Sequence, residues 1–169
     1  MPVNPQRPVP KILIIGYGNP GRGDDGLGPA LAAEIEALGL PGVTVDIDYQ
    51  LTVDHAALIA AQDVVVFADA MIGLDRPCRF ARVVTEAPAA LGSHDVLPEV
   101  ALALAGLLFG HAPPGWMLAI AGRDFGEVKE GLSLPAQANL IAAVAFLRDW
   151  IAATQAPVPG RGDGACAAE

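Results

Sequence analysis

The sequence predicts an α/β fold: a mostly parallel, twisted, five-stranded sheet covered by helices on both faces, in three layers. Two observations predict it. Short apolar runs alternate with amphipathic segments from residue 11 to residue 155, and glycines and prolines separate them. Strands that alternate with helices favour parallel pairing, because each helix returns the chain to the same end of the sheet. The 169 residues suffice for one domain with its own core.

The first half of the chain supplies three strands and two helices. The first and third strands are continuous apolar runs, which is typical of buried parallel strands. The second alternates apolar and polar residues, as expected of a strand with one more exposed side. Gly39 and Pro41 end the first helix. The expected strands are 11–17, 43–48 and 64–69, and the expected helices are 27–38 and 53–61.

The second half supplies two strands and two helices. The connection between the third and fourth strands is short, which predicts one antiparallel edge. Gly110 ends the third helix, and Ser133 is a plausible N-cap of the last. The expected strands are 79–84 and 116–121, and the expected helices are 98–109 and 134–153. Residues 1–10 are expected to be an extended lead-in and residues 156–169 a disordered tail, which leaves a single domain over 11–155.

The composition excludes several classes of protein. A net charge of −9 disfavours nucleic acids and anionic membranes as partners, because like charges repel. Cys78 and Cys166 have neither a disulfide framework nor metal-ligand spacing, so both are expected to be free thiols. The longest apolar stretch, residues 100–109, is too short to span a bilayer, and no signal peptide is visible. We therefore expect a cytoplasmic protein that binds neither nucleic acid nor membrane.

The loop after the first strand is the most informative segment of the sequence. It contains the dinucleotide-binding pattern G-x-G-x-x-G, formed by Gly16, Gly18 and Gly21. This pattern supports a hypothesis of a dinucleotide-binding oxidoreductase domain. Two features of the loop oppose it. Asp24 and Asp25 would repel a pyrophosphate at the helix N-terminus, and Pro20 removes one amide donor.

Three loops expected at one edge of the sheet carry residues typical of a metal site. Ligands of parallel sheets bind beyond the carboxyl ends of the strands, where Asp25, Asp69 and His94 are expected. Two carboxylates and one imidazole suit a divalent transition metal, with positions left for water or substrate. Each residue also has a simpler interpretation: Asp25 as a helix N-cap, Asp69 in an Asx-turn and His94 as a solvated loop residue. His55 could approach this edge, although a surface position is the simpler expectation.

Several motifs together resemble one protein family. Gly16-Tyr17-Gly18-Asn19 followed by Asp24-Asp25-Gly26-Leu27-Gly28 resembles the opening G-x-G-N…D-[DE]-x-x-G of the hydrogenase maturation endopeptidases. These cytoplasmic proteases remove the C-terminal extension of the large subunit of nickel-iron hydrogenases. The resemblance continues, in order, at Phe67-Ala68-Asp69-Ala70, Ser93-His94-Asp95-Val96-Leu97 and Glu130-Gly131-Leu132-Ser133. It spans residues 11–150 and also implies a twisted sheet flanked by helices.

The resemblance implies roles for these residues. Asp25, Asp69 and His94 take the place of the family's nickel-recognition triad, which is shared with catalysis. Nickel is implied to arrive with the substrate, the large-subunit precursor, and other divalent ions are implied to replace it in crystals. Asn19 and Asp24 flank the triad. Asn19 is a candidate for substrate binding, and Asp24 is a further catalytic candidate.

The loop after the second strand departs from the family pattern. Many members have D-G-G-T there, whereas residues 48–52 read D-Y-Q-L-T, so Asp48 and Thr52 are the substrate-binding candidates. The residues of these motifs resemble those of the family branch that serves bidirectional, NAD-coupled hydrogenases. No G-x-S-x-G elbow is present. Water activation is therefore assigned to polarisation by the metal, or to a carboxylate such as Asp24 or Asp25 acting as base. A non-catalytic, hydrogenase-specific chaperone is the remaining alternative.

Overall fold

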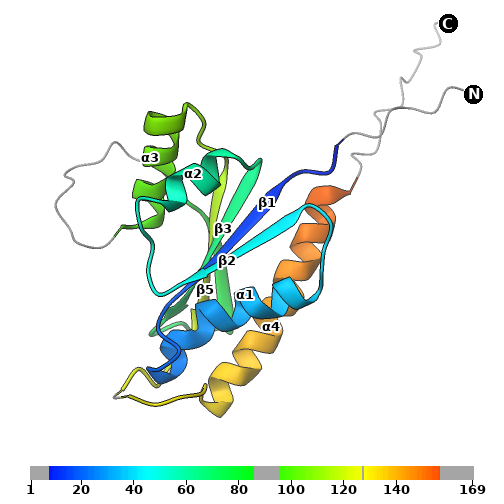
Figure 1. Cartoon of the computed structure of the whole chain (residues 1–169). Coiled ribbons are helices and arrows are strands. Elements are labelled where there is room, and N and C mark those ends of the chain that lie inside the picture. The colour runs from blue at the N-terminus through cyan, green and yellow to red at the C-terminus, as the bar shows by residue number, and fades with distance from the viewer. Residues whose placement is uncertain (1–7, 86–95, 127, 157–169) are drawn as a thin grey trace, which may run out of the picture.

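The protein forms one five-stranded sheet with helices on both faces (Figure 1). A computed structural model describes residues 8–85, 96–126 and 128–156. The strand order is β2-β1-β3-β5-β4, and all neighbours are parallel except β4, which runs antiparallel to β5. The predicted fold class and antiparallel edge are confirmed. The elements are β1 (Ile12–Tyr17), η1 (Gly23–Gly26, a 3-10 turn), α1 (Leu27–Ala37), β2 (Val43–Asp48), α2 (His55–Ala60), β3 (Val64–Met71), β4 (Cys78–Arg82), α3 (Pro98–Phe109), β5 (Gly115–Ala121) and α4 (Leu134–Gln155).

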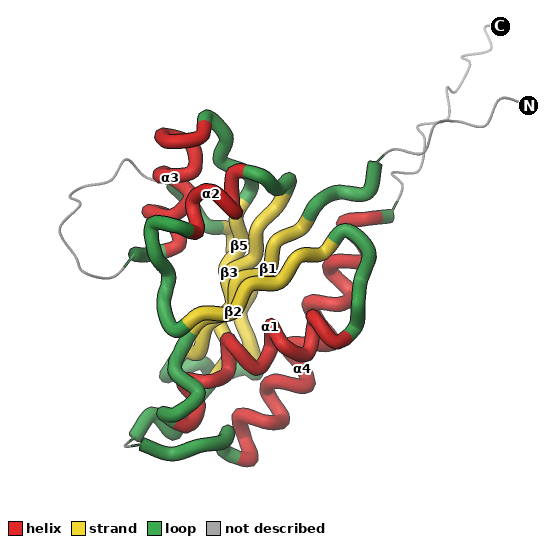
Figure 2. The backbone as a smooth tube through the Cα atoms, viewed as in Figure 1, coloured by secondary structure: helices red, strands yellow, loops and turns green. Residues whose placement is uncertain are grey.

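The helices form two layers, one on each face of the sheet. Figure 2 shows α1 and α4 on one side of the strands and α2 with α3 on the other. Alternate residues of β1 point to opposite layers: Ile14 packs in the cluster that includes α1 and α4, and Ile15 in the cluster that includes α2 and α3. Both clusters are mostly aliphatic, as the low aromatic content indicates. Within the described ranges, no helix is long and apolar enough to cross a membrane.

The C-terminal end of β3 determines where Asp69 lies in the fold. β3 continues through Asp69 to Met71, two residues beyond the expected end, because residues 69–71 pair with residues 119–121 of β5. Asp69 therefore lies within a strand, and its interpretation as part of an Asx-turn is wrong. The predicted N-cap of α4 is confirmed, since the Ser133 hydroxyl accepts a hydrogen bond from the Ala136 amide at 3.3 Å. The predicted lead-in and tail lie mostly outside the described residues.

The register of the strands brings polar residues of three strands to one edge. Tyr17 of β1 pairs with Asp48 of β2. Gly16 pairs with Ala68 of β3, so Asp69 comes next to Tyr17 on the adjacent strand. Paired residues of parallel strands share a face, and alternation puts these three on the same face as Ile15, which α2 and α3 cover. The carboxyl edge of this face therefore carries Asp48, Tyr17 and Asp69 in a row.

Candidate functional site

The glycines of the loop between β1 and α1 allow close contact between the loop and the strand ends. A Cβ on Gly18, whose φ is +140°, would lie 2.1 Å from the carbonyl oxygen of Asp25. A Cβ on Gly28 would lie 2.3 Å from the carbonyl oxygen of Tyr17 and 2.5 Å from that of Ala68. Only glycine fits such approaches. Gly18 of the loop and Gly28 at the start of α1 therefore allow η1 and α1 to pack closely against β1 and β3.

The amides of this loop are not available to a phosphate. The N–H groups of residues 18, 19 and 21–25 each donate to an oxygen of the protein itself. A dinucleotide fingerprint works because such amides point at the pyrophosphate and are free to donate to it. The structure therefore removes the physical basis of the dinucleotide hypothesis, although the sequence pattern matches letter for letter.

Asp24 is buried and holds two loops together. Its Oδ2 accepts hydrogen bonds from the amides of Arg123 and Asp124, both at 2.9 Å, and its Oδ1 accepts from the amide of Ser133 at 2.8 Å. The Ser133 hydroxyl also donates to Oδ2, at 2.9 Å. Burial raises the pKa of Asp24, but these hydrogen bonds outweigh it, and the net pKa lies below the usual value. Asp24 has no exposed surface, so the geometry favours a structural role over the catalytic role considered for it.

The side chain of Asp25 has different hydrogen-bond partners from that of Asp24. It is half-buried, and its Oδ2 accepts a hydrogen bond from the amide of Asn19 at 3.0 Å. Neither η1 nor α1 has a side-chain cap, so the interpretation of Asp25 as an N-cap is wrong. The side chain of Asn19 is itself used within the loop, because its Oδ1 accepts from the amide of Gly21 at 2.9 Å.

Asp69 is the carboxylate whose charge the protein disfavours most clearly. Burial raises its pKa to about 6; the amide of Ala70, which donates at 2.7 Å, lowers it, and the nearby charge of Asp25 raises it further. Within the described residues, this electrostatic effect of Asp25 on Asp69 is what links the two carboxylates, and their convergence with His94 stays a prediction. A cation bound between the two carboxylates would remove this repulsion, so the pair is suited to hold one.

Sequence reasoning missed two neighbours of this pair. The pKa of the Tyr17 hydroxyl lies above its usual value, first because of burial and then because of the charges of Asp69 and Glu99. Glu99 lies in the first turn of α3, so a third acidic residue comes close to the site from the helix layer. The sequence signal that could have indicated Glu99 was its position at the start of the expected helix 98–109, directly after the motif of residues 93–97.

The third predicted ligand, His94, lies outside the described residues, and its place in the triad stays a prediction. Within the described ranges, no group of three or more His, Cys, Asp or Glu side chains is arranged to hold a metal ion. The described part of the predicted triad is therefore the pair of Asp25 and Asp69.

The two predicted substrate-binding residues of the β2–α2 loop both lie next to His55. The Thr52 amide donates to Nδ1 of His55 at 2.9 Å, and a carboxylate oxygen of Asp48 lies 3.9 Å from Nε2. His55 is only 3% exposed, so its expected surface position is wrong. This buried histidine contacts β2 at the same sheet edge as Tyr17, and β1 lies between β2 and the strand that carries Asp69.

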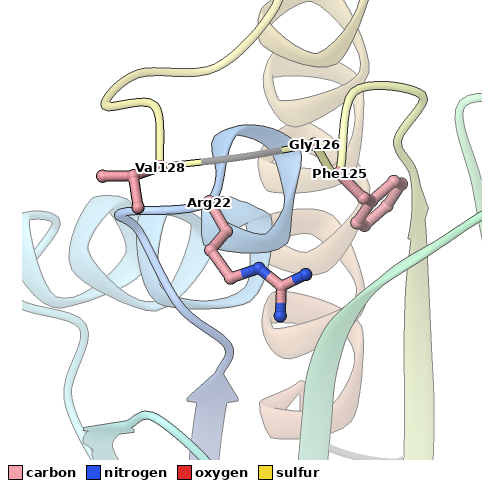
Figure 3. Close-up of a pocket in the computed structure, with 4 residues that line it drawn as sticks. All are labelled: Arg22, Phe125, Gly126 and Val128. Atoms are coloured by element: carbon pink, nitrogen blue, oxygen red, sulfur yellow. The ribbon is translucent and has the colours of Figure 1, made fainter.

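A hollow opens beside the glycine loop, where the β5–α4 connection meets it. Its volume is about 700 Å³, within the usual size of a ligand site, and Arg22, Phe125, Gly126 and Val128 line it. Figure 3 shows the extended Arg22 side chain and the Phe125 ring at its walls. Lys129 fixes the loop beside it, because its amide donates to the Gly21 carbonyl at 2.8 Å and its carbonyl accepts from the Gly23 amide at 2.7 Å. Two backbone hydrogen bonds therefore join the loops on either side of the hollow.

Solved structures of several proteins resemble this one. HycI, a NiFe hydrogenase maturation protease from Thermococcus kodakarensis KOD1, has a TM-score of 0.65 at 20% sequence identity, covering 84% of this chain and 92% of that chain. The hydrogenase maturating endopeptidase HybD from E. coli has a TM-score of 0.62 at 20% identity, covering 85% and 93%. A hydrogenase 2 maturation peptidase from a Thaumarchaeota archaeon has a TM-score of 0.61 at 21% identity, covering 83% and 97%.

No family model and no curated protein sequence matches the chain. The structural likeness extends over most of the chain and almost all of each relative, at identities that establish a common fold. The chain therefore has the fold of the hydrogenase maturation proteases.

Proposed function

We propose that this protein is an endopeptidase that removes the C-terminal extension of a nickel-iron hydrogenase large-subunit precursor after nickel insertion. The observation that carries the proposal is the likeness of the fold to hydrogenase maturation proteases, together with Asp25 and Asp69, two carboxylates near the carboxyl edge of the sheet. In a chain of net charge −9, such a pair favours a cationic feature of a substrate.

The substrate's nickel is the recognition element in this proposal. Asp25 from η1 and Asp69 from β3 bind it, and His94 supplies the imidazole that a transition metal prefers beside carboxylates. In a precursor without nickel, no cation is present to neutralise the charges of these carboxylates. Selectivity for the loaded precursor then follows, because the mutual repulsion of the pair is relieved only when the cation is present.

The chemistry proposed is hydrolysis by water. Asp25 and Asp69 hold the metal-bearing segment so that the scissile carbonyl lies beside the cation, which polarises it. Water adds to the carbonyl carbon, the carbon–nitrogen bond breaks, and the proton passes to the leaving amine. Asp24 is not the base in this scheme, since hydrogen bonds from Arg123, Asp124 and Ser133 occupy both its oxygens.

The test is a processing assay with purified protein and two forms of one precursor. The nickel-loaded form should be shortened by the mass of its extension, and the nickel-free form should stay intact. Asp69→Asn and His94→Gln should abolish processing in folded protein. The matched controls are Asp149→Asn and His111→Gln, both on exposed side chains away from the site, and they should process normally.

Three outcomes would contradict the proposal in different ways. Equal cleavage of both precursor forms would exclude nickel as the recognition element. A stable complex with the precursor but no shortened product would favour a chaperone. Binding of NAD without any effect on the precursor would restore the dinucleotide hypothesis, which the occupied loop amides argue against.

A further inference from the structure

We propose that His55 is a positioning residue that holds the β2–α2 loop, residues 49–54, at the substrate side of the site. The inference rests on the proposed function, because Asp48 and Thr52 are candidates for substrate binding only if the protein has that function. It concerns a buried histidine that takes no part in the chemistry proposed above. Three observations carry it: the tautomer of His55, its link to the strand ends, and its contacts with Thr52 in the loop.

The hydrogen bonds of His55 select one tautomer. The amide of Thr52 can only donate, and it lies 2.9 Å from Nδ1, so Nδ1 is the unprotonated acceptor. Nε2 then carries the proton and donates toward Oδ2 of Asp46 at 3.2 Å, with Oδ2 of Asp48 at 3.9 Å. The Thr52 carbonyl oxygen also lies 3.3 Å from Nδ1, but the opposite tautomer would place the Thr52 amide against an N–H and an unprotonated Nε2 against the Asp46 carboxylate. With both nitrogens occupied and 3% of its surface exposed, His55 is not placed to touch substrate.

His55 is joined to the acidic edge through two strands. Asp46 and Asp48 belong to β2 and pair with Ile15 and Tyr17 of β1, and Tyr17 lies next to Asp69. The carbonyl oxygen of Asp48 also accepts a hydrogen bond from the amide of Gly18 at 3.2 Å. Asp48 thus contacts the glycine loop through its backbone while its carboxylate faces His55.

Other hydrogen bonds restrain the two ends of the loop that His55 holds: the Tyr49 amide donates to Oδ1 of Asp48 at 2.6 Å, and the Thr52 carbonyl accepts from the His55 amide at 3.3 Å. Leu51 is buried, whereas Tyr49 and Val53 are largely exposed. The Thr52 amide has His55 as its acceptor, and the Thr52 hydroxyl lies 3.0 Å from the same nitrogen. Without this acceptor, the Thr52 amide would have to face water or remain unpaired, and the loop would lose a fixed point. An apolar residue of similar size could fill the space but could not supply that acceptor.

Two substitutions separate the two ends of the imidazole. In His55→Asn the side-chain oxygen takes the place of Nδ1 and can accept from Thr52, but the side chain does not reach Asp46. In His55→Leu both contacts are lost while the core stays filled. Each variant is assayed on the nickel-loaded precursor, below its own unfolding temperature, and KM and kcat are measured separately.

The expected result is a rise in KM of about tenfold for His55→Leu, as loss of one buried hydrogen bond would give, with kcat within about twofold of wild type. His55→Asn should restore KM to within about threefold of wild type. Exchange of the Thr52 amide with deuterium should be fast in His55→Leu and slow in the other two proteins. An unchanged KM in folded His55→Leu would overturn the inference, and so would a His55→Asn variant as impaired as His55→Leu.

A spectroscopic measurement keeps this inference separate from the proposed function. The imidazole nitrogen chemical shifts of His55 in the wild-type protein should report an unprotonated Nδ1 and a protonated Nε2. A protonated Nδ1 in the neutral ring would overturn the inference without any assay of activity. If the wild-type protein cleaves no precursor while the tautomer and the Thr52 exchange behave as expected, the proposed function fails and the restraint of the loop by His55 stands.

Discussion

The regions around Asp24 and Asp69 lie at the same edge of the sheet, yet the protein treats the two carboxylates in opposite ways. Around Asp24, donors from the β5–α4 loop surround both oxygens, and its pKa lies below the usual value. Around Asp69, burial is compensated by one backbone amide only, Asp25 adds repulsion, and its pKa is about 6. Hydrogen bonds within the fold compensate the charge of Asp24, whereas the charge of Asp69 is left for a ligand to compensate.

This difference separates stability from function among neighbouring acids. A fully hydrogen-bonded buried carboxylate stabilises the folded state, and removing it leaves donors unpaired. A carboxylate buried against a like charge costs stability in the metal-free protein and is retained where a cation binds. Substitutions at the two positions should therefore affect stability and processing in opposite proportion.

The largest effect expected is the loss of processing in Asp69→Asn, by at least about 100-fold, since several kcal/mol of charge stabilisation disappears. The same substitution should not destabilise the metal-free protein. The folded pKa is raised, so the stability linked to Asp69 is full below the unfolded pKa near 4 and is lost as pH rises through about 6. The free energy of unfolding of the variant at pH 8 should equal or exceed that of wild type. Denaturant titration of both proteins measures it, and a clear loss of stability would argue against the assignment.

The next effect is the loss of stability in Asp24→Asn. Asparagine has one acceptor oxygen instead of two, so it cannot accept all the hydrogen bonds that Arg123, Asp124 and Ser133 donate to Asp24. We therefore expect a loss of roughly 3 kcal/mol in the free energy of unfolding. Asp25→Asn is the matched control, one residue away, and should lose less than about 1 kcal/mol while impairing processing. Thermal unfolding and the precursor assay, run on both variants, distinguish the two roles. An inactive but fully stable Asp24→Asn would reverse them.

A smaller effect is the pH dependence of the Asp24 contribution. Its folded pKa is lowered, so its stabilisation is present above the unfolded pKa near 4 and is lost as pH falls through the folded value. The difference in unfolding free energy between wild type and Asp24→Asn should be constant near neutral pH and shrink below about pH 4. Chemical denaturation at a series of pH values tests this. A difference that grows on acidification would contradict the assigned direction of the shift.

The sequence was sufficient to predict the fold, whereas the convergence of Asp25, Asp69 and His94 stays a prediction. Alternation of strands and helices places the carboxyl ends of the parallel strands at one edge, so the loops after these strands are expected there without any knowledge of side-chain contacts. The approach of the loop to β1 and β3 was not predictable from the glycine pattern, because the same letters serve a phosphate or a tight packing contact. Only the acceptors of the loop amides distinguish a phosphate-binding loop from a tight packing contact.

The remaining contacts were beyond single-sequence reasoning because they depend on how the segments pack in the tertiary structure. Asp24 reaches partners about a hundred residues away, and no local pattern indicates which of two adjacent acids turns inward. His55 was expected at the surface because histidine in a short amphipathic helix is usually solvated. Its burial depends on Asp46 and Thr52, whose positions follow from the tertiary structure.

The smallest expected effect concerns Glu99, the acid that α3 adds to the Asp69 region. Its charge raises the pKa of the Tyr17 hydroxyl, after burial and Asp69. In a Tyr49→Phe background, which leaves Tyr17 as the only tyrosine, Glu99→Gln should shift tyrosinate formation to lower pH. Processing should fall by only a few-fold, because Glu99 acts on the site through its field. An unchanged tyrosine titration would place Glu99 outside the site, and loss of processing as complete as in Asp69→Asn would make it a direct ligand of the substrate's cation.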